Sequence, residues 1–211
     1  MIGILGGAFD PVHFGHLRPA LELHETLRLD SLLWIPTGEP AHREAAQASD
    51  EQRVAMLELA IAGTTGWQLD RRELQRQGPA YMVDTLGELR AELGADIPLC
   101  LLVGMDAFAG LDSWHRWQQL FELAHLVVSH RPGIELAESG RSEALTAELR
   151  QRQVTEIETL QQSPAGAIYF QPVSQLEISS THIRALLAAG RDPRYLLPEK
   201  VLEFIRSNDL Y

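Results

Sequence analysis

Short apolar runs alternate with longer amphipathic segments along most of the chain, and this alternation constrains the fold more than any other feature. A buried parallel strand shows as a continuous apolar run, whereas a helix repeats its apolar residues every three or four positions. The runs that predict strands are residues 2–5, 31–36, 67–74, 99–103, 123–129 and 167–172. Helical stripes lie between them, for example Val54, Leu57 and Ile61, or Met82, Leu86, Leu89 and Leu93. Strands that alternate with helices predict an α/β fold in which helices flank a parallel sheet.

Two segments interrupt this alternation. Residues 38–48 are polar and lack periodicity, so we expect a surface loop there. Residues 133–166 are rich in Glu, Gln and Arg, and Leu145, Leu149 and Ile157 could support one or two surface helices. Because the chain has 211 residues and no repeat or linker that divides it, we expect a single domain over residues 1–211.

The net charge of −11 and the single cysteine exclude several classes of protein. Such a surface repels nucleic acid and anionic membranes. No apolar run approaches the roughly 18–20 residues of a membrane-spanning helix, and no signal-peptide pattern follows Met1. One cysteine cannot form an intramolecular disulfide. We therefore expect a cytoplasmic protein that binds neither nucleic acid nor membranes, as a monomer or a small homo-oligomer.

The loop that leaves the first predicted strand has the features of a phosphate site. Gly6 and Gly7 let a phosphate approach the main chain, and a helix that begins near residues 14–16 presents free N–H groups to an anion. His13 and His16 lie three residues apart and add two nitrogen donors. Taken alone, the pair also fits incidental histidines on a Gly-Gly turn, or a zinc site that lacks a third ligand.

Other phosphate-binding loops fit this sequence less well. The first glycines lack the G-x-G-x-x-G spacing, and no acidic residue ends the second predicted strand, which disfavours a dinucleotide-binding dehydrogenase. The G-x-x-x-x-G-K-[ST] pattern occurs nowhere, which excludes a P-loop.

A second polar motif, Ile-Ser-Ser-Thr-His-Ile-Arg at residues 178–184, follows the last predicted strand. Ser180 and Thr181 stand at a predicted helix start, and Arg184 lies one turn after Ser180. Hydroxyls, free amides and a guanidinium at one spot suit a polyphosphate, which Arg can bind through two parallel hydrogen bonds. Taken alone, the motif also fits an ordinary capped helix with a solvated arginine.

Together, the two motifs resemble those of the nucleotidyltransferase superfamily that carries H-x-G-H and I-S-S-T-x-x-R. Within it, further segments resemble bacterial nicotinate mononucleotide adenylyltransferases, namely residues 36–43, 81–86, 104–106 and 114–117. The resemblance runs nearly end to end and implies a Rossmann-like nucleotidyltransferase fold with a small helical C-terminal part at about 178–211. Two departures are Ala8, where the family often has Thr, and Pro40-Ala41-His42-Arg43 in place of P-P-H-K.

The resemblance implies transfer of AMP from ATP to nicotinate mononucleotide, which yields nicotinic acid adenine dinucleotide and pyrophosphate. The attacking phosphate is already ionised near neutral pH, so catalysis would rest on positioning and charge stabilisation. By resemblance, His16 would stabilise the α-phosphate, His13 would bind the ATP phosphates, and Mg²⁺ would arrive with ATP. The β- and γ-phosphates would be held by Ser180, Thr181 and Arg184, and the rest of the ATP site would be lined by Gly7, Ala8, Phe9, Gly104 and Asp106.

The acceptor end is also assigned by resemblance. Trp117 would stack on the pyridine ring, amides near Thr85 would take the carboxylate, and Asp106 would bind a ribose hydroxyl. His42 and Arg43 would close over the substrate. Four alternatives stay open: an adenylyltransferase for nicotinamide mononucleotide, one for phosphopantetheine, a cytidylyltransferase, and a nucleotide sensor without catalysis.

Overall fold

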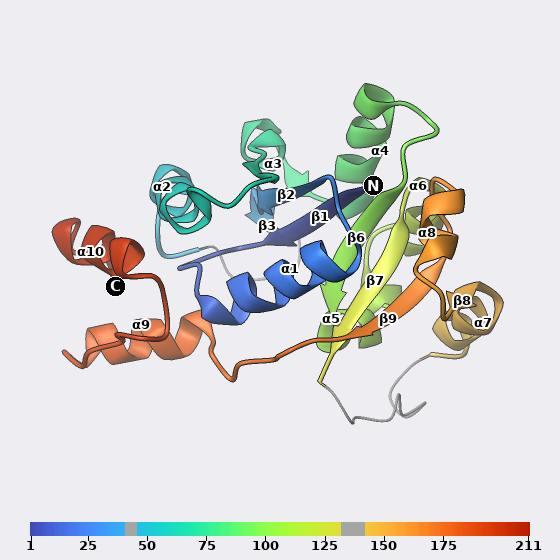
Figure 1. Cartoon of the computed structure of the whole chain (residues 1–211). Coiled ribbons are helices and arrows are strands. Elements are labelled where there is room, and N and C mark those ends of the chain that lie inside the picture. Colours follow the sequence, from blue (N-terminus) through green and yellow to red (C-terminus); the bar gives the residue numbers. More distant parts are fainter. Residues whose placement is uncertain (41–45, 132–141) are drawn as a thin grey trace.

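The computed structural model describes residues 1–40, 46–131 and 142–211 (Figure 1). Within these residues, a seven-stranded sheet has the order β4-β2-β1-β6-β7-β9-β8, and every neighbouring pair is parallel. Its strands are β1 (Ile2–Gly7), β2 (Ser31–Pro36), β4 (Trp67–Leu69), β6 (Leu99–Gly104), β7 (His125–His130), β8 (Gln153–Val154) and β9 (Ile168–Pro172). A separate short pair joins β3 (Glu39–Pro40) to β5 (Pro79–Ala80). The predicted parallel α/β architecture is therefore confirmed.

The helices bury residues in two hydrophobic clusters, one on each face of the sheet. The first cluster takes residues from α1 (Phe14–Thr26), α2 (Asp50–Ile61), α8 (Glu158–Gln162), α9 (Ser180–Ala188) and α10 (Glu199–Ser207). The second takes residues from α4 (Met82–Leu93), α5 (Met105–Ala109), α6 (Leu120–Leu123) and α7 (Glu143–Arg152). The short helix α3 (Arg72–Gln75) and the 3₁₀ turns Leu111–Ser113 and Trp117–Gln119 complete the described helical elements.

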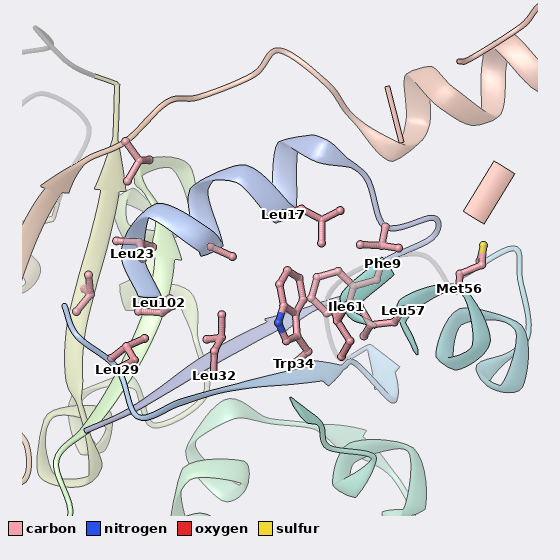
Figure 2. Packing of buried hydrophobic residues seen from close by; sticks show 14 of the residues in the cluster. Phe9, Leu17, Leu23, Leu29, Leu32, Trp34, Met56, Leu57, Ile61 and Leu102 are labelled. Atoms are coloured by element: carbon pink, nitrogen blue, oxygen red, sulfur yellow. The ribbon is translucent and has the colours of Figure 1, made fainter. Parts of the chain in front are cut away.

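The strand β2 shows how one apolar run serves both faces. Leu32 and Trp34 belong to the first cluster, and Leu33 and Ile35 belong to the second, because successive side chains in a strand point to opposite faces. Figure 2 shows Trp34 beneath α1, close to the ring of Phe9. Each large side chain buried in this way contributes about 1.5–3 kcal/mol to stability.

The prediction of a strand over residues 67–74 is only partly right. The strand β4 ends at Leu69, and α3 begins at Arg72. The Asp70 carboxylate causes the change, because it accepts the N–H of Arg72 at 2.9 Å and pairs with the Arg72 guanidinium at 2.6 Å. A side chain that satisfies a free amide in this way favours a helical turn over a continued strand.

The described part of the segment 133–166, residues 142–166, is more structured than the sequence predicts. The two helices expected there are α7, capped by the Ser142 hydroxyl, and α8. However, α7 buries Leu145 and Leu149, and β8 extends the sheet by pairing with β9, which the sequence did not predict. Residues 132–141 lie outside the described part, as do residues 41–45 of the expected surface loop.

The predicted helical part at 178–211 consists of α9 and α10. Figure 1 shows α10 beside α2, with which it makes contacts, so this part packs on the same face as α1. No helix in the described ranges is long and apolar enough to cross a membrane.

Candidate active site

A cleft of about 950 Å³ opens at the carboxyl ends of β1, β6 and β7. Strand β1 lies between β2 and β6, so the chain leaves the centre of the sheet in opposite directions on either side of β1. Ligands of open α/β sheets bind at such a point. Five of the predicted site residues line the cleft, namely Gly7, Ala8, His16, Gly104 and Asp106.

The two histidines of the first motif stack on one another at the start of α1. Their ring centroids are 3.7 Å apart, and the backbone N–H of His13 donates to Nδ1 of His16 at 3.3 Å. Because Nδ1 of His16 accepts this hydrogen bond, Nε2 carries the proton of the neutral ring. His16 thus presents a hydrogen-bond donor from a ring whose orientation is fixed by its partner.

Both rings are neutral at physiological pH. Burial lowers the pKa of His13 to about 4, and burial together with the neighbouring His13 lowers the pKa of His16 to about 3. The side chain of His13 is 4% exposed, and its Nδ1 is buried with no hydrogen-bond partner among the described residues. A buried nitrogen without a partner is costly, which makes this atom a candidate for a ligand contact.

Phe9 packs behind the glycine loop, in the first hydrophobic cluster, and does not line the cleft. Its ring is 2% exposed, lies edge-on to His16 at 5.3 Å between centroids, and belongs to the first cluster. A Cβ on Gly7 would come within 3.0 Å of this ring, so the ring packs directly against the glycine loop. Phe9 therefore holds the loop and His16 in place, and it is not among the residues that line the cleft.

The second motif meets the first although about 170 residues separate them. The Ser180 hydroxyl donates to the carbonyl of Pro11 at 3.0 Å, and the Arg184 guanidinium donates to the carbonyl of Asp10 at 2.7 Å. Ser179, and not Ser180, caps α9. The side chain of Thr181 is exposed. These residues stand beside the cleft and are not part of its lining.

Glycine at position 15 is required by this meeting. A Cβ there would lie 2.9 Å from the carbonyl oxygen of Ile178 and 2.9 Å from the His13 ring. The H-x-G-H motif thus lets the segment before α9 approach the first turn of α1 closely.

Arg53 is a buried cation of the cleft that the sequence analysis missed. It is 2% exposed, and it donates to the carbonyls of Ala8 and Thr37, each at 2.8 Å, and to Asp50 at 2.6 Å. It therefore joins the loops that follow β1 and β2. Its position one helical turn before the buried Leu57 is a signal the sequence does carry, because a charge on the apolar face of a helix requires partners.

The prediction for Thr85 needs correction. Helix α4 begins at Met82, and the amide of Thr85 already donates to the carbonyl of Tyr81. The amides without an acceptor inside their own helix belong to the first turn, and Met82 and Val83 line the cleft. The Thr85 hydroxyl is buried and donates to Glu73 at 2.7 Å.

Glu73 lines the cleft next to these amides, and no sequence pattern singles it out. It is 3% exposed, and burial raises the pKa of its carboxyl, with the hydrogen bond from Thr85 acting in the opposite direction. A Cβ on Gly38 would lie 2.3 Å from the Glu73 carbonyl, so the loop after β2 is in close contact with α3.

Another wall of the cleft comes from the segment of residues 114–117, which contains two tryptophans. Trp114 and His115 line the cleft, and the His115 ring lies 4.2 Å from that of Tyr81, between centroids. The ring of Trp117 instead packs edge-on against Phe121, outside the lining. An ion pair between Arg116 and Asp84 fastens this segment to α4.

The remaining predictions concern the loop and a metal. His42 and Arg43 lie outside the described residues, so their predicted roles have no structural account. Among the described residues, no group of three or more His, Cys, Asp or Glu side chains could hold a metal ion.

With this geometry in view, comparison with known proteins defines the class. The chain belongs to the cytidylyltransferase-like family, whose model matches residues 4–186. It is 51% identical over 212 residues to a protein of Methylococcus capsulatus named a probable nicotinate-nucleotide adenylyltransferase, with 100% of this chain and 99% of that protein covered. A Halorhodospira halophila protein of the same name is 50% identical over 200 residues, with 95% and 90% covered. Within the cytidylyltransferase-like family, the chain therefore groups with the nicotinate-nucleotide adenylyltransferases and is a nucleotidyltransferase.

Solved structures agree on the fold. The nicotinic acid mononucleotide adenylyltransferase of Plasmodium falciparum, complexed with NaAD, superposes with a TM-score of 0.70 at 16% identity and covers 100% of this chain and 96% of that one. The same protein complexed with APC gives a TM-score of 0.69. The expected Rossmann-like nucleotidyltransferase fold is confirmed.

Proposed function

We propose that the chain is a nicotinate-nucleotide adenylyltransferase, which transfers AMP from ATP to nicotinate mononucleotide and releases pyrophosphate. One observation carries the catalytic assignment: the two phosphate motifs, at opposite ends of the chain, are hydrogen-bonded to each other beside a cleft at the carboxyl edge of the sheet. Relatives about 50% identical over nearly the whole chain carry the name of this activity.

The chemistry needs no general base. A 5′-phosphate oxygen of the mononucleotide attacks the α-phosphorus of ATP, a new P–O bond forms, and the bond to the β-phosphate oxygen breaks. The acceptor phosphate is already largely ionised, because its second pKa is near 6. The protein thus has to align the two phosphates and stabilise the charge that develops between them.

We assign these tasks to the residues that converge on the glycine loop. His16, neutral and with its proton on Nε2, donates to an α-phosphate oxygen, and His13 offers its unpartnered Nδ1 to the phosphates. Ser180, Thr181 and Arg184 face the leaving pyrophosphate, while the backbone of Gly7 and Ala8 lies against the triphosphate. Asp106 binds a ribose hydroxyl.

The acceptor ring lies at the far end of the cleft. The free amides of the first turn of α4, from Met82 and Val83, bind the nicotinate carboxylate, since a helix N-terminus favours an anion. Trp114 already lines this end, and Trp117 reaches the ring only if residues 111–119 shift.

Mg²⁺ fits this donor set as a partner of the ATP phosphates. The site offers amides of the glycine loop, a neutral imidazole and the guanidinium of Arg184, all of which would contact phosphate oxygens and leave others for a metal ion. When bound, Mg²⁺ neutralises phosphate charge and helps the pyrophosphate leave. We place this activity in the cytoplasm, in keeping with the single buried cysteine, Cys100.

Pyrophosphate release by the purified protein tests the proposal. With Mg²⁺ and ATP, we expect a strong preference for nicotinate mononucleotide over nicotinamide mononucleotide and phosphopantetheine. His16→Ala should lower kcat by about 10²-fold or more, as loss of a transition-state donor does elsewhere. Activity only with another acceptor would overturn the acceptor assignment. ATP binding without any transfer would favour a nucleotide sensor, and an unchanged kcat in His16→Ala would remove His16 from the mechanism.

A further inference from the structure

The carboxylate of Asp10 is buried where the loop of the first motif meets the second motif. Its residue is 4% exposed and lies in the loop between β1 and α1. A buried carboxylate requires several hydrogen-bond donors to offset its lost hydration. The backbone amides of Gln47 and Ala48, just before α2, donate to its two oxygens at 2.8 and 3.2 Å.

The third donor comes from a distant part of the chain. The hydroxyl of Tyr211, after α10, donates to Oδ1 of Asp10 at 2.5 Å. The ring of Tyr211 packs against the first hydrophobic cluster, which fixes the direction of the hydroxyl. Burial and the contact with Asp10 raise the pKa of Tyr211 above its ordinary range, so the hydroxyl keeps its proton at any pH at which the protein is assayed.

Arg184 stands beside this arrangement without a close ion pair to the carboxylate. One terminal nitrogen donates to the Asp10 carbonyl at 2.7 Å, but it lies 3.8 Å from the nearest carboxylate oxygen. The Nε atom of Arg184 is buried and has no hydrogen-bond partner in the described part of the chain. The carboxylate is thus satisfied chiefly by amides and the tyrosine, and the guanidinium keeps donors for another anion.

We propose that Tyr211 is a positioning residue for adenylyl transfer: its hydroxyl occupies the Asp10 carboxylate, so that Arg184 remains available to the ATP polyphosphate. This inference rests on the proposed function. Without the hydroxyl, Oδ1 keeps only the 3.2 Å contact with Ala48, and the nearest remaining cation is Arg184. The guanidinium then closes onto the carboxylate and is withdrawn from the phosphates.

The test is the substitution Tyr211→Phe, which keeps the ring and removes the hydroxyl. We expect the KM for ATP to rise about tenfold, as for loss of a hydrogen bond to a charged group, with kcat changed less than about twofold. The KM for nicotinate mononucleotide should not change, because the effect acts through Arg184, which the proposed function assigns to the ATP phosphates and not to the acceptor. Tyr195→Phe is the matched control, since Tyr195 is 87% exposed.

A double-mutant cycle separates positioning through Arg184 from a general loss of structure. In an Arg184→Ala background, Tyr211→Phe should raise neither the KM nor the Kd for ATP any further. Thermal unfolding of each variant shows whether it is folded, and Tyr211→Ala, which also removes the ring, serves only as a comparison for packing.

Each outcome of these measurements either supports or overturns the positioning role of Tyr211. An unchanged KM for ATP in Tyr211→Phe overturns the inference, and so does an additive effect of the two substitutions. If the wild-type protein transfers no adenylyl group, the proposed function fails. The Kd of ATP measured without acceptor across the same cycle then still tests the coupling of Tyr211 to Arg184.

Discussion

The proposed chemistry of this site depends largely on a single pair of stacked imidazoles, those of His13 and His16. The ring centroids of His13 and His16 are 3.7 Å apart, and burial keeps both rings in the neutral form at neutral pH. Two neutral donors bind a phosphate less strongly than two cations would, but they are oriented in advance and their protonation state does not vary with small changes in pH. Preorganised donors of this kind favour the transition state over the free substrate.

Burial of the neutral His13 ring should make the protein less stable at acidic pH. The unfolded chain binds a proton at His13 below pH 6.5, whereas the folded chain does so only below about pH 4, so stability falls as the pH drops through this window. His13→Phe removes the difference. Between pH 7.5 and pH 5.0, we expect the wild-type protein to lose about 1–2 kcal/mol more unfolding free energy than the variant. Urea unfolding at the two pH values measures this, and equal losses would contradict the neutral state of His13.

The sequence locates some residues of the candidate site more closely than others, for a physical reason. His13, His16 and Arg184 belong to motifs that resemble those of a known superfamily, and the structure places them in the first turns of α1 and α9 or directly before them. Met82 and Trp114 reach the cleft only through tertiary packing, and the sequence pointed instead to Thr85 and Trp117, three residues further along the chain in each case. Spacing identifies an element, but the turn at which it begins decides which of its groups are free.

Elements meet at the site through one close approach. The first turn of α1 touches the segment before α9 at Gly15, where the carbonyl of Ile178 leaves no room for a side chain. The two phosphate motifs are therefore held in register by contact between backbones as well as by the hydrogen bonds of Ser180 and Arg184.

Substitution of two helical glycines tests this contact. Gly15→Ala should cost about 1–3 kcal/mol and raise the KM for ATP, because the new methyl group pushes the two motifs apart. Gly87→Ala is the matched control, since a Cβ there meets nothing within 4 Å. Alanine is the better helix former, so Gly87→Ala should stabilise by about 0.5–1 kcal/mol and leave turnover unchanged. Chemical denaturation and steady-state kinetics distinguish the two, and equal behaviour would show that Gly15 has no steric role.

Among the helices and strands, the long elements could be predicted from the sequence and the short ones could not. Apolar runs identify β1, β2 and β6, because a strand buried on both faces has a simple composition. By contrast, α3 depends on a hydrogen bond that the Arg72 N–H donates to Asp70, and β8 depends on an available edge of β9. Neither condition is visible in a window of sequence.

The molecule as a whole carries a charge of −11, although its proposed substrates are anions. Two arginines stand at the site: Arg53 is buried in the wall of the cleft, and Arg184 lies beside the glycine loop. Such an arrangement lowers the local cost of binding a polyphosphate while the remaining surface stays acidic.

Treatment with a chelator tests whether Mg²⁺ is needed for activity, for protein stability, or for both. With excess EDTA, we expect pyrophosphate release to fall to background and to return when Mg²⁺ exceeds the chelator, because Mg²⁺ enters with ATP. The Tm of the nucleotide-free protein should not change under EDTA. Calorimetry measures the Tm, and the pyrophosphate-release assay measures the activity. A lower Tm under EDTA would reveal a structural metal, and full activity under EDTA would remove Mg²⁺ from the proposal.

The hydrogen bond between Arg184 and Asp10 spans 174 positions, and this separation has a consequence for biosynthesis. At about 5–20 residues per second, a ribosome needs roughly 10–35 s to travel from one residue to the other. During that time, the nascent chain carries the first phosphate motif without the second. Both motifs exist only after translation has passed α9, so under the proposed function we expect ATP to bind through both motifs only in a chain whose synthesis has passed that point.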